Sequence, residues 1–478
     1  MKSKPSHLRV SSLTKKPKCF APWINLYAQK REDWWRFKVC CLSEEVVEVD
    51  SIDEYFDSDH IKQVTKSLLE NKFPSACVRC EFNAEVDEYP DIAIYQYQIL
   101  RIRHKKNLYK NNEDRLAWTN SVHHDPDDRH DKFVLREFEK LSLDDIKEIL
   151  SSDDDKFIQL DLRPGNLCNL KCKMCNTASS TEIAKEYVDF HQDKEFIDKL
   201  KKTDHDKSSQ ILAKDDIDYF KKLSKNYTNT KEHKEEIYEL FDYANLRRLK
   251  LLGGEPSIDP TIISILKTLK EKNLHKDDSF RLQITSNLTN VNKIWLDYFK
   301  LFNIKLTVSM DGAGRTYEYI RAPFKWKAIE QNLYKLPANL YKDLSVNVVG
   351  SNIMFLDLKE WIPQFTDLQK MIPFHINYIE CMYPNHMTLQ AIPLEYKFKI
   401  KDDLNSLKKY YKSNTRINEL LSHMERDLDN HLKMKDTFKR HYLDQFFLIN
   451  RKQDELRRQN LFDINYTKEI YNNLTYRR

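Results

Sequence analysis

From residue 156 onward the sequence alternates between short apolar runs and amphipathic stretches, and this alternation limits the folds that the chain can adopt. The apolar runs are strand candidates, at Phe157–Leu162, Leu246–Leu252, Phe280–Thr285, Ile304–Met310, Leu344–Val349 and Phe374–Ile379. A helical pattern follows each of the first five, at Ser179–Phe190, Thr261–Lys272, Val291–Phe299, Trp326–Leu336 and Leu356–Phe365. Such alternation is typical of parallel β/α units. We therefore predict an α/β fold with an open (β/α)6 barrel, a partial TIM barrel.

Short polar motifs follow four of these predicted strands. In strand order they are Cys168 to Cys175, then Gly253-Gly254-Glu255-Pro256, then Ser286-Asn287, and finally Ser309-Met310-Asp311. In β/α barrels the chemistry lies at the carboxyl ends of the strands. The placement of the motifs thus indicates one site at that end of the barrel.

The first motif holds three cysteines, Cys168, Cys172 and Cys175, at spacing C-x3-C-x2-C. Three thiolates can ligate three irons of a [4Fe–4S] cluster and leave the fourth iron open for chemistry. A zinc site with three cysteines and one histidine is the alternative that this spacing alone leaves open.

The residues around this triad resemble the radical S-adenosylmethionine (radical SAM) superfamily. The stretch Leu162–Cys175 resembles the cluster loop of its peptide- and protein-modifying branch, and Leu251–Pro256 resembles its GGEP element. The resemblance implies that S-adenosylmethionine (SAM) binds the open iron and is cleaved reductively to a 5′-deoxyadenosyl radical, which abstracts a substrate hydrogen. It also implies an electron donor such as flavodoxin or ferredoxin.

The same resemblance assigns roles to further residues. Cys168, Cys172 and Cys175 would be the catalytic cluster ligands. The cofactor-binding residues would be Met174 near the adenine and Gly253, Gly254, Glu255 and Pro256 at the SAM ammonium group. Ser286, Asn287 and Ser309 would contact the ribose or the carboxylate of SAM, and Asp311 would also bind the cofactor.

A second group of cysteines precedes the barrel. Cys19, Cys40 or Cys41, Cys77 and Cys80 lie around a predicted β-hairpin and a predicted helix at residues 50–72. They resemble the auxiliary-cluster modules called SPASM and twitch domains, which implies a second iron–sulfur cluster held by Cys19, Cys40, Cys77 and Cys80. A zinc site is the alternative, because C-x2-C pairs are also typical of zinc.

These patterns divide the chain into five parts. They are a flexible arm at 1–18, a small cysteine-rich α+β auxiliary domain at 19–100, a linker at 101–155, the radical SAM core at 156–394 with a helical insertion at 191–245, and a helical extension at 395–478.

Composition restricts the partners. The chain has 79 basic and 74 acidic residues, a balance that argues against a dedicated nucleic-acid-binding protein. No apolar run approaches the ~20 residues of a membrane span. Nine cysteines without a signal peptide favour metal binding in the cytoplasm.

Only six glycines occur where average usage gives about thirty, and five of them lie in or beside the motifs; the sixth is Gly350.

Together these features predict a radical SAM enzyme that modifies a peptide or protein side chain. Two alternatives remain open. The substrate could instead be a small molecule such as a sugar, nucleotide or lipid precursor, or the chain could be a metal-stabilised binding protein without turnover.

Overall fold

The computed structural model describes residues 22, 25–31, 34–40, 43, 45–70, 72–77, 157–207, 209–214, 216–225, 228, 230–242, 244–277, 280–434 and 437–476. The predicted arm at 1–18, Cys19, Cys41, Cys80 and the predicted linker lie outside these residues.

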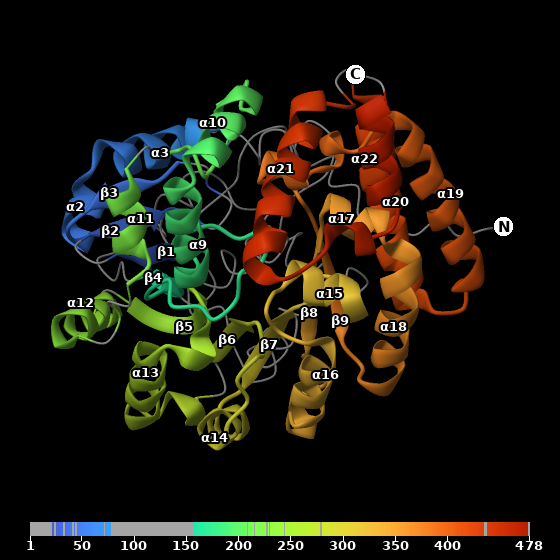
Figure 1. Ribbon diagram of the computed structural model, residues 1–478. Helices are drawn as coiled ribbons and strands as arrows, with labels where there is room; N and C mark the ends of the chain where they lie inside the picture. The colour runs from blue at the N-terminus through green and yellow to red at the C-terminus, as the bar shows by residue number, and fades with distance from the viewer. Residues whose placement is uncertain are drawn as a thin grey trace.

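The described part of the chain is built on one nine-stranded sheet, with strand order β3-β2-β1-β4-β5-β6-β7-β8-β9 (Figure 1). Its strands are β1 (Asn25–Lys30), β2 (Trp35–Lys38), β3 (Val47–Val49), β4 (Phe157–Arg163), β5 (Ala244–Leu251), β6 (Arg281–Ser286), β7 (Ile304–Ser309), β8 (Ser345–Gly350) and β9 (His375–Glu380). The last six are parallel to one another and match the six predicted strands. This sheet does not close on itself, which confirms the partial barrel.

The N-terminal hairpin belongs to the same sheet. Strands β1 and β2 pair antiparallel, as the alternation of their apolar residues predicts. Strand β1 then pairs parallel with β4, so that Asn25 lies opposite Gln159 and Gln29 opposite Arg163. The hairpin therefore extends the barrel sheet beyond its first core strand.

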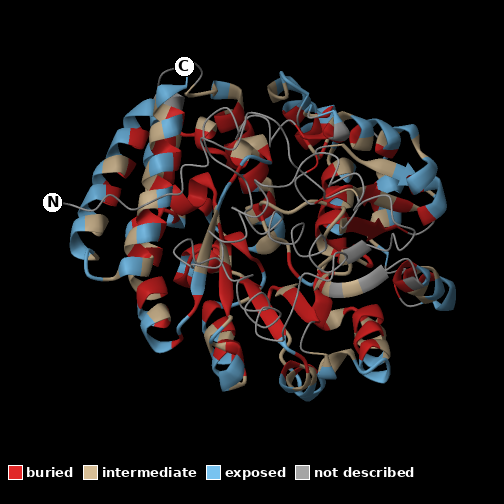
Figure 2. Cartoon of the chain, turned by 180° about the vertical axis from the view of Figure 1, so that it is seen from behind, coloured by how far each residue is buried: buried red, intermediate tan, exposed pale blue. Residues whose placement is uncertain are grey.

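Helices cover the outer face of the sheet, and the buried residues of Figure 2 lie mainly between the two layers. The helices that follow the core strands are α9 (Thr181–Gln192), α13 (Pro260–Glu271), α14 (Lys293–Leu301), α15 (Gly314–Ile320), α16 (Trp326–Tyr334), α17 (Asn352–Leu356) and α18 (Leu358–Met371). In α13, Ile262, Ile265, Leu266 and Leu269 recur on one face and are buried. This helical spacing is why that segment packs as a helix on the strands.

The helix predicted at residues 50–72 is two helices. They are α2 (Ile52–Asp57) and α3 (Asp59–Leu69), which meet at Ser58. The backbone of Ser58 is extended, and its hydroxyl accepts a hydrogen bond from the Ile61 amide as the N-cap of α3. Serine is a preferred N-cap residue, and this cap starts a new helix.

Two further groups of helices come from the insertion and from the C-terminal extension. The insertion forms α10 (Lys194–Thr203), α11 (Ile217–Leu223) and α12 (Lys231–Asp242). The extension forms α19 (Leu394–Tyr410), α20 (Thr415–Lys433), α21 (Arg440–Arg457) and α22 (Thr467–Tyr476). Helix α10 packs against α21, so the insertion and the extension meet (Figure 1). None of the helices described here is both long enough and apolar enough to cross a membrane.

Candidate active site at the carboxyl ends of the strands

The three cysteines lie in a loop, residues 164–179, that we call the cluster loop and that connects β4 to α9. Side chains at its two ends hold the loop. The Asn166 amide donates to the carbonyl oxygens of Thr177 (3.0 Å) and Leu223 (2.8 Å). The Thr181 hydroxyl donates to the Cys168 carbonyl (3.1 Å) and accepts from the Cys168 amide (3.3 Å). The loop is thus fixed by buried hydrogen bonds at the start of α9.

Cys168 is buried, whereas Cys172 and Cys175 are half-buried, and the three thiols have polar neighbours. Burial raises the pKa of all three thiols, and Cys172 further raises those of Cys168 and Cys175, the latter to about 12. Arg321 Nη1 lies 3.6 Å from the Cys172 sulfur and donates to it. Thiols that are costly to ionise alone become thiolates when a metal compensates their charge. This donor set fits an iron–sulfur cluster.

The GGEP element packs against the cluster loop through its backbone. The Gly254 amide donates to the Gly165 carbonyl (3.2 Å), and the Glu255 amide donates to the Leu167 carbonyl (2.7 Å). A Cβ atom on Gly254 would lie 2.0 Å from the Leu167 oxygen, and one on Gly253 would lie 2.8 Å from the Gly165 oxygen. These glycines therefore allow the end of β5 to approach the cluster loop.

The Glu255 carboxylate connects the ends of β5 and β6. It is 1 % exposed, and it accepts hydrogen bonds from the Ser286 hydroxyl (2.6 Å), the Asn287 amide (2.5 Å) and the Ser257 amide (3.0 Å). Burial raises the pKa of Glu255, and these hydrogen bonds partly oppose the increase. The structure thus brings together three of the predicted residues, Glu255, Ser286 and Asn287.

The Asn287 side chain extends from β6 toward the cluster loop. Its Nδ2 donates to Asn169 Oδ1 (3.1 Å) and lies 4.0 Å from the Cys168 sulfur. Thr289 fixes the orientation of the amide, since its backbone N–H and its hydroxyl both donate to Asn287 Oδ1. Asn287 therefore joins the third strand end to the first cysteine.

The end of β7 contributes a buried ion pair. Asp311 Oδ2 lies 2.7 Å from Arg321 Nη2, and Asp311 Oδ1 accepts from the Val349 amide (2.8 Å). Asp311 thus binds the guanidinium that also faces Cys172. Ser309 is half-buried at the same strand end, and Met174 is half-buried against the core.

Helix α21 supports the cluster loop from the far side. Lys173 Nζ donates to Gln453 Oε1 (3.0 Å) and lies 4.1 Å from the centre of the Tyr319 ring. The fully buried Glu186 of α9 accepts from Arg457 Nε (2.7 Å) and Nη2 (2.5 Å). The C-terminal extension is therefore part of the site's support.

Residues 162–357 match the family model described as the radical SAM superfamily. This segment contains the three cysteines, the GGEP element and the strand ends that surround them. Residues 162–357 form a radical SAM domain. The match confirms the predicted resemblance to this superfamily. The match ends at residue 357, between α17 and α18, so α18, β9 and the helical extension lie beyond it.

The chain is similar to several solved structures at low sequence identity. No curated protein sequence matches it. Native anSMEcpe with bound AdoMet is 15 % identical with a TM-score of 0.33, over 54 % of this chain and 62 % of that one. SuiB of Streptococcus suis bound to S-adenosylmethionine is 12 % identical with a TM-score of 0.34, over 81 % and 69 %. The same SuiB bound to precursor peptide SuiA is 13 % identical with a TM-score of 0.33, over 81 % and 71 %. The chain spans less than two thirds of anSMEcpe.

Two of the four predicted auxiliary ligands lie within the described residues. Cys40, just after β2, and Cys77, in a short 3₁₀ turn, are both buried. Cys19 and Cys80 lie outside the described part of the chain. The auxiliary cluster stays a prediction.

Sequence reasoning missed several supporting residues of the radical SAM domain. Lys173 of the cluster loop and Glu186 of α9 form one hydrogen-bonded network with two residues of α21, Gln453 and Arg457. No local pattern marks these residues, because their partners lie more than 260 residues away. Asn169 is another supporting residue that was missed, although its position between Cys168 and Cys172 in the sequence could have indicated it.

Proposed function

We propose that this protein is a radical SAM enzyme that abstracts a hydrogen atom from a peptide or protein substrate. The observation that carries the proposal is the packing of the GGEP element on the cysteine loop, through Gly254 and Glu255, within a matched radical SAM domain. Cys168, Cys172 and Cys175 would hold a [4Fe–4S] cluster. When bound, this cluster supplies the electron that cleaves SAM.

The residues of the chain would then position SAM and exclude water. Glu255 would face the SAM ammonium group, which would compensate a buried negative charge. Asn287 and Ser286 would hold the Glu255 carboxylate in place. Arg321 would stabilise the Cys172 thiolate and thereby favour cluster binding.

The peptide or protein substrate is supported by the resemblance of Leu162–Cys175 to the peptide- and protein-modifying branch. Cys19, Cys40, Cys77 and Cys80 would hold an auxiliary iron–sulfur cluster. An electron donor such as flavodoxin or ferredoxin would reduce the enzyme in the cytoplasm, where thiols stay reduced.

The chemistry is tested by anaerobic reconstitution followed by addition of SAM and dithionite. The wild type should release 5′-deoxyadenosine. A variant with Cys168, Cys172 and Cys175 all replaced by Ala should lose about four irons and release none. Release of 5′-deoxyadenosine by the triple variant would overturn the proposed function.

The substrate class is tested with a deuterated cell extract separated into a peptide and protein fraction and a small-metabolite fraction. Abstraction from a deuterated substrate transfers deuterium to 5′-deoxyadenosine, which mass spectrometry detects. We expect transfer only from the peptide and protein fraction. Transfer only from small metabolites would overturn the peptide assignment and leave the radical chemistry intact.

A further inference from the structure

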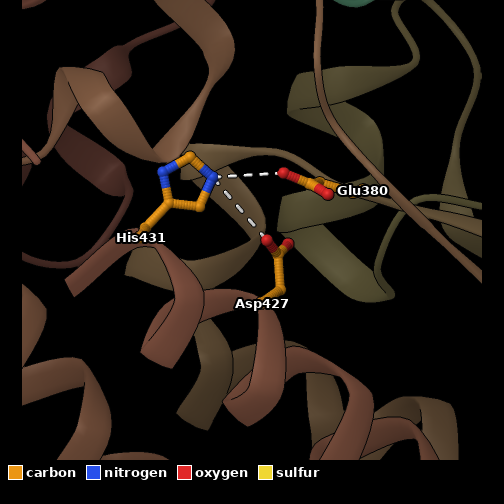
Figure 3. Close-up of side chains that lie close together, drawn as sticks. All are labelled: Glu380, Asp427 and His431. Carbon is orange, nitrogen blue, oxygen red and sulfur yellow. Dashed lines mark hydrogen bonds and ion pairs between the residues drawn. The ribbon is translucent and has the colours of Figure 1, made fainter. Parts of the chain in front are cut away.

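A second cluster of metal-ligating side chains lies beyond the matched radical SAM domain. Glu380 ends β9, and Asp427 and His431 lie one turn apart on α20 (Figure 3). His431 Nε2 lies 3.2 Å from Glu380 Oε1 and 3.7 Å from Asp427 Oδ1. The three ligand atoms all lie within 4.8 Å of one another, so one ion could contact all three.

The two helix residues are buried more deeply than ordinary surface groups. Asp427 is 6 % exposed and His431 is 7 % exposed. Asp427 Oδ1 points toward His431 and accepts no hydrogen bond from any residue that the structure describes. A buried carboxylate oxygen without a donor is costly, and a cation is the partner that compensates it best.

A hydroxyl group orients this carboxylate from outside the cluster. Tyr378, two residues before Glu380 on β9, donates its hydroxyl hydrogen to Asp427 Oδ2 (2.5 Å). This contact leaves Oδ1 turned toward His431 and Glu380. Outer hydrogen bonds of this kind orient metal ligands in proteins.

Gly350, at the end of β8, makes room for that hydroxyl group. A Cβ atom on Gly350 would lie 2.0 Å from the Tyr378 oxygen and 2.6 Å from the ring carbon that bears it. Gly350, one of only six glycines in the chain, thus allows the Tyr378 hydroxyl group to lie against the end of β8. The arrangement around Asp427 involves β8, β9 and α20 together.

We propose that Glu380, Asp427 and His431 form a binding site for a divalent transition-metal cation, with Zn²⁺ as the best-fitting ion. One imidazole and two carboxylates are ligands that Zn²⁺ accepts, and a site with three protein ligands keeps a fourth position open. The Glu380 side chain is 47 % exposed, so water or a ligand reaches that position from solvent. None of the three ligands is a cysteine, which separates them chemically from the cluster loop; the neighbouring Cys381 thiol donates to the Tyr383 carbonyl instead (3.6 Å).

The test measures Zn²⁺ and Co²⁺ binding by the full-length protein with its iron–sulfur sites reconstituted. The wild type should bind one Zn²⁺ that Asp427→Asn and His431→Gln do not bind. Tyr378→Phe should bind it roughly 10- to 100-fold more weakly, because the carboxylate loses its orienting contact. Asp429→Asn is the matched control, since it removes a carboxylate on α20 that pairs with Lys401 outside the cluster.

Co²⁺ distinguishes this site from the cysteine sites. Bound by oxygen and nitrogen it should show visible d–d bands without sulfur-to-cobalt charge transfer, and Asp427→Asn should abolish the bands. Equal Zn²⁺ binding by the wild type, Asp427→Asn and His431→Gln would overturn the proposal and leave a metal-free proton-sharing cluster. Charge-transfer bands alone would also overturn it, because they would place the ion on cysteine.

Discussion

The guanidinium of Arg321 donates a hydrogen bond to the sulfur of Cys172 from a distance of 3.6 Å. The same group lies 2.7 Å from Asp311, so one buried cation contacts both a predicted cluster ligand and a carboxylate at the end of β7. Burial lowers the pKa of Arg321, but Asp311 and Cys172 outweigh this effect, and the guanidinium stays charged. The ion pair therefore places a fixed positive charge beside the proposed cluster.

Replacement of Arg321 by Met should destabilise the protein by about 3–5 kcal/mol, because it leaves Asp311 buried without its partner. Urea unfolding under anaerobic conditions measures this loss. Lys325→Met is the matched control, since its pair with Glu318 is at the surface and should contribute less than about 1 kcal/mol. Similar losses of unfolding free energy in the two variants would show that the buried ion pair stabilises the protein no more than the surface pair does.

Replacement of Gly254 by Ala should lower the iron content of the reconstituted protein. The new Cβ would meet the Leu167 carbonyl at 2.0 Å, so the cluster loop must move away from β5. Iron analysis and the visible absorbance of the cluster measure the effect. Full iron occupancy in this variant would contradict the proposed role of the close backbone approach.

Replacement of Glu255 by Ala should have a different effect. The Glu255 amide still donates to the Leu167 carbonyl, so the cluster loop keeps its backbone contact and its iron. The carboxylate that we place at the SAM ammonium group is lost, and the SAM dissociation constant should rise at least tenfold. Equilibrium binding of SAM to the reconstituted variant tests this, and an unchanged constant would remove Glu255 from the SAM site.

Metal analysis of the wild type should reveal the auxiliary cluster. Four irons in the core predict about eight per chain if the second cluster is a cube and about six if it holds two irons. Replacement of Cys40 or Cys77 by Ser should remove only the second set. About four irons with one additional zinc that the Cys40 and Cys77 variants lose would instead favour a zinc site.

Stability should depend on the ionisation of Asp259, the N-cap of α13. Burial raises the pKa of this carboxyl group to about 6, although hydrogen bonds from Thr261 and Thr228 oppose the increase. The folded state therefore binds the proton more tightly than the unfolded state does. The free energy of unfolding should fall by about 3 kcal/mol in total as the pH rises from about 3 to 7, through both pKa values, and should not change further from this group above about 7.

Asp259→Asn isolates that contribution, because asparagine also caps helices but does not ionise in this range. Urea midpoints at several pH values should show a smaller decrease between pH 4 and 6 in the variant than in the wild type. Parallel curves for the two proteins would assign the pH dependence to other groups.

Local sequence patterns predicted the barrel well, because each core strand and helix carries its own periodicity. They also placed Glu255 and Asn287 after predicted strands, and the structure has both residues at strand ends. Ser58 shows the limit of this approach, since a single capping side chain divides one amphipathic stretch into two helices. The parallel pairing of β1 with β4 could not be predicted, because a long intervening segment separates the two strands. The contact of Glu380 with His431, 51 residues later, likewise has no local signature.

The contact between Lys173 and Gln453 joins residues that lie 280 positions apart. During synthesis at ~5–20 residues per second, the cluster loop therefore leaves the ribosome roughly 15 to 60 s before α21 can reach it. Late in that interval the cysteines have gained their neighbours from the barrel, but the contact of the cluster loop with α21 has not yet formed. Iron and sulfide delivered before translation ends would therefore meet the cluster loop before its contact with α21 forms.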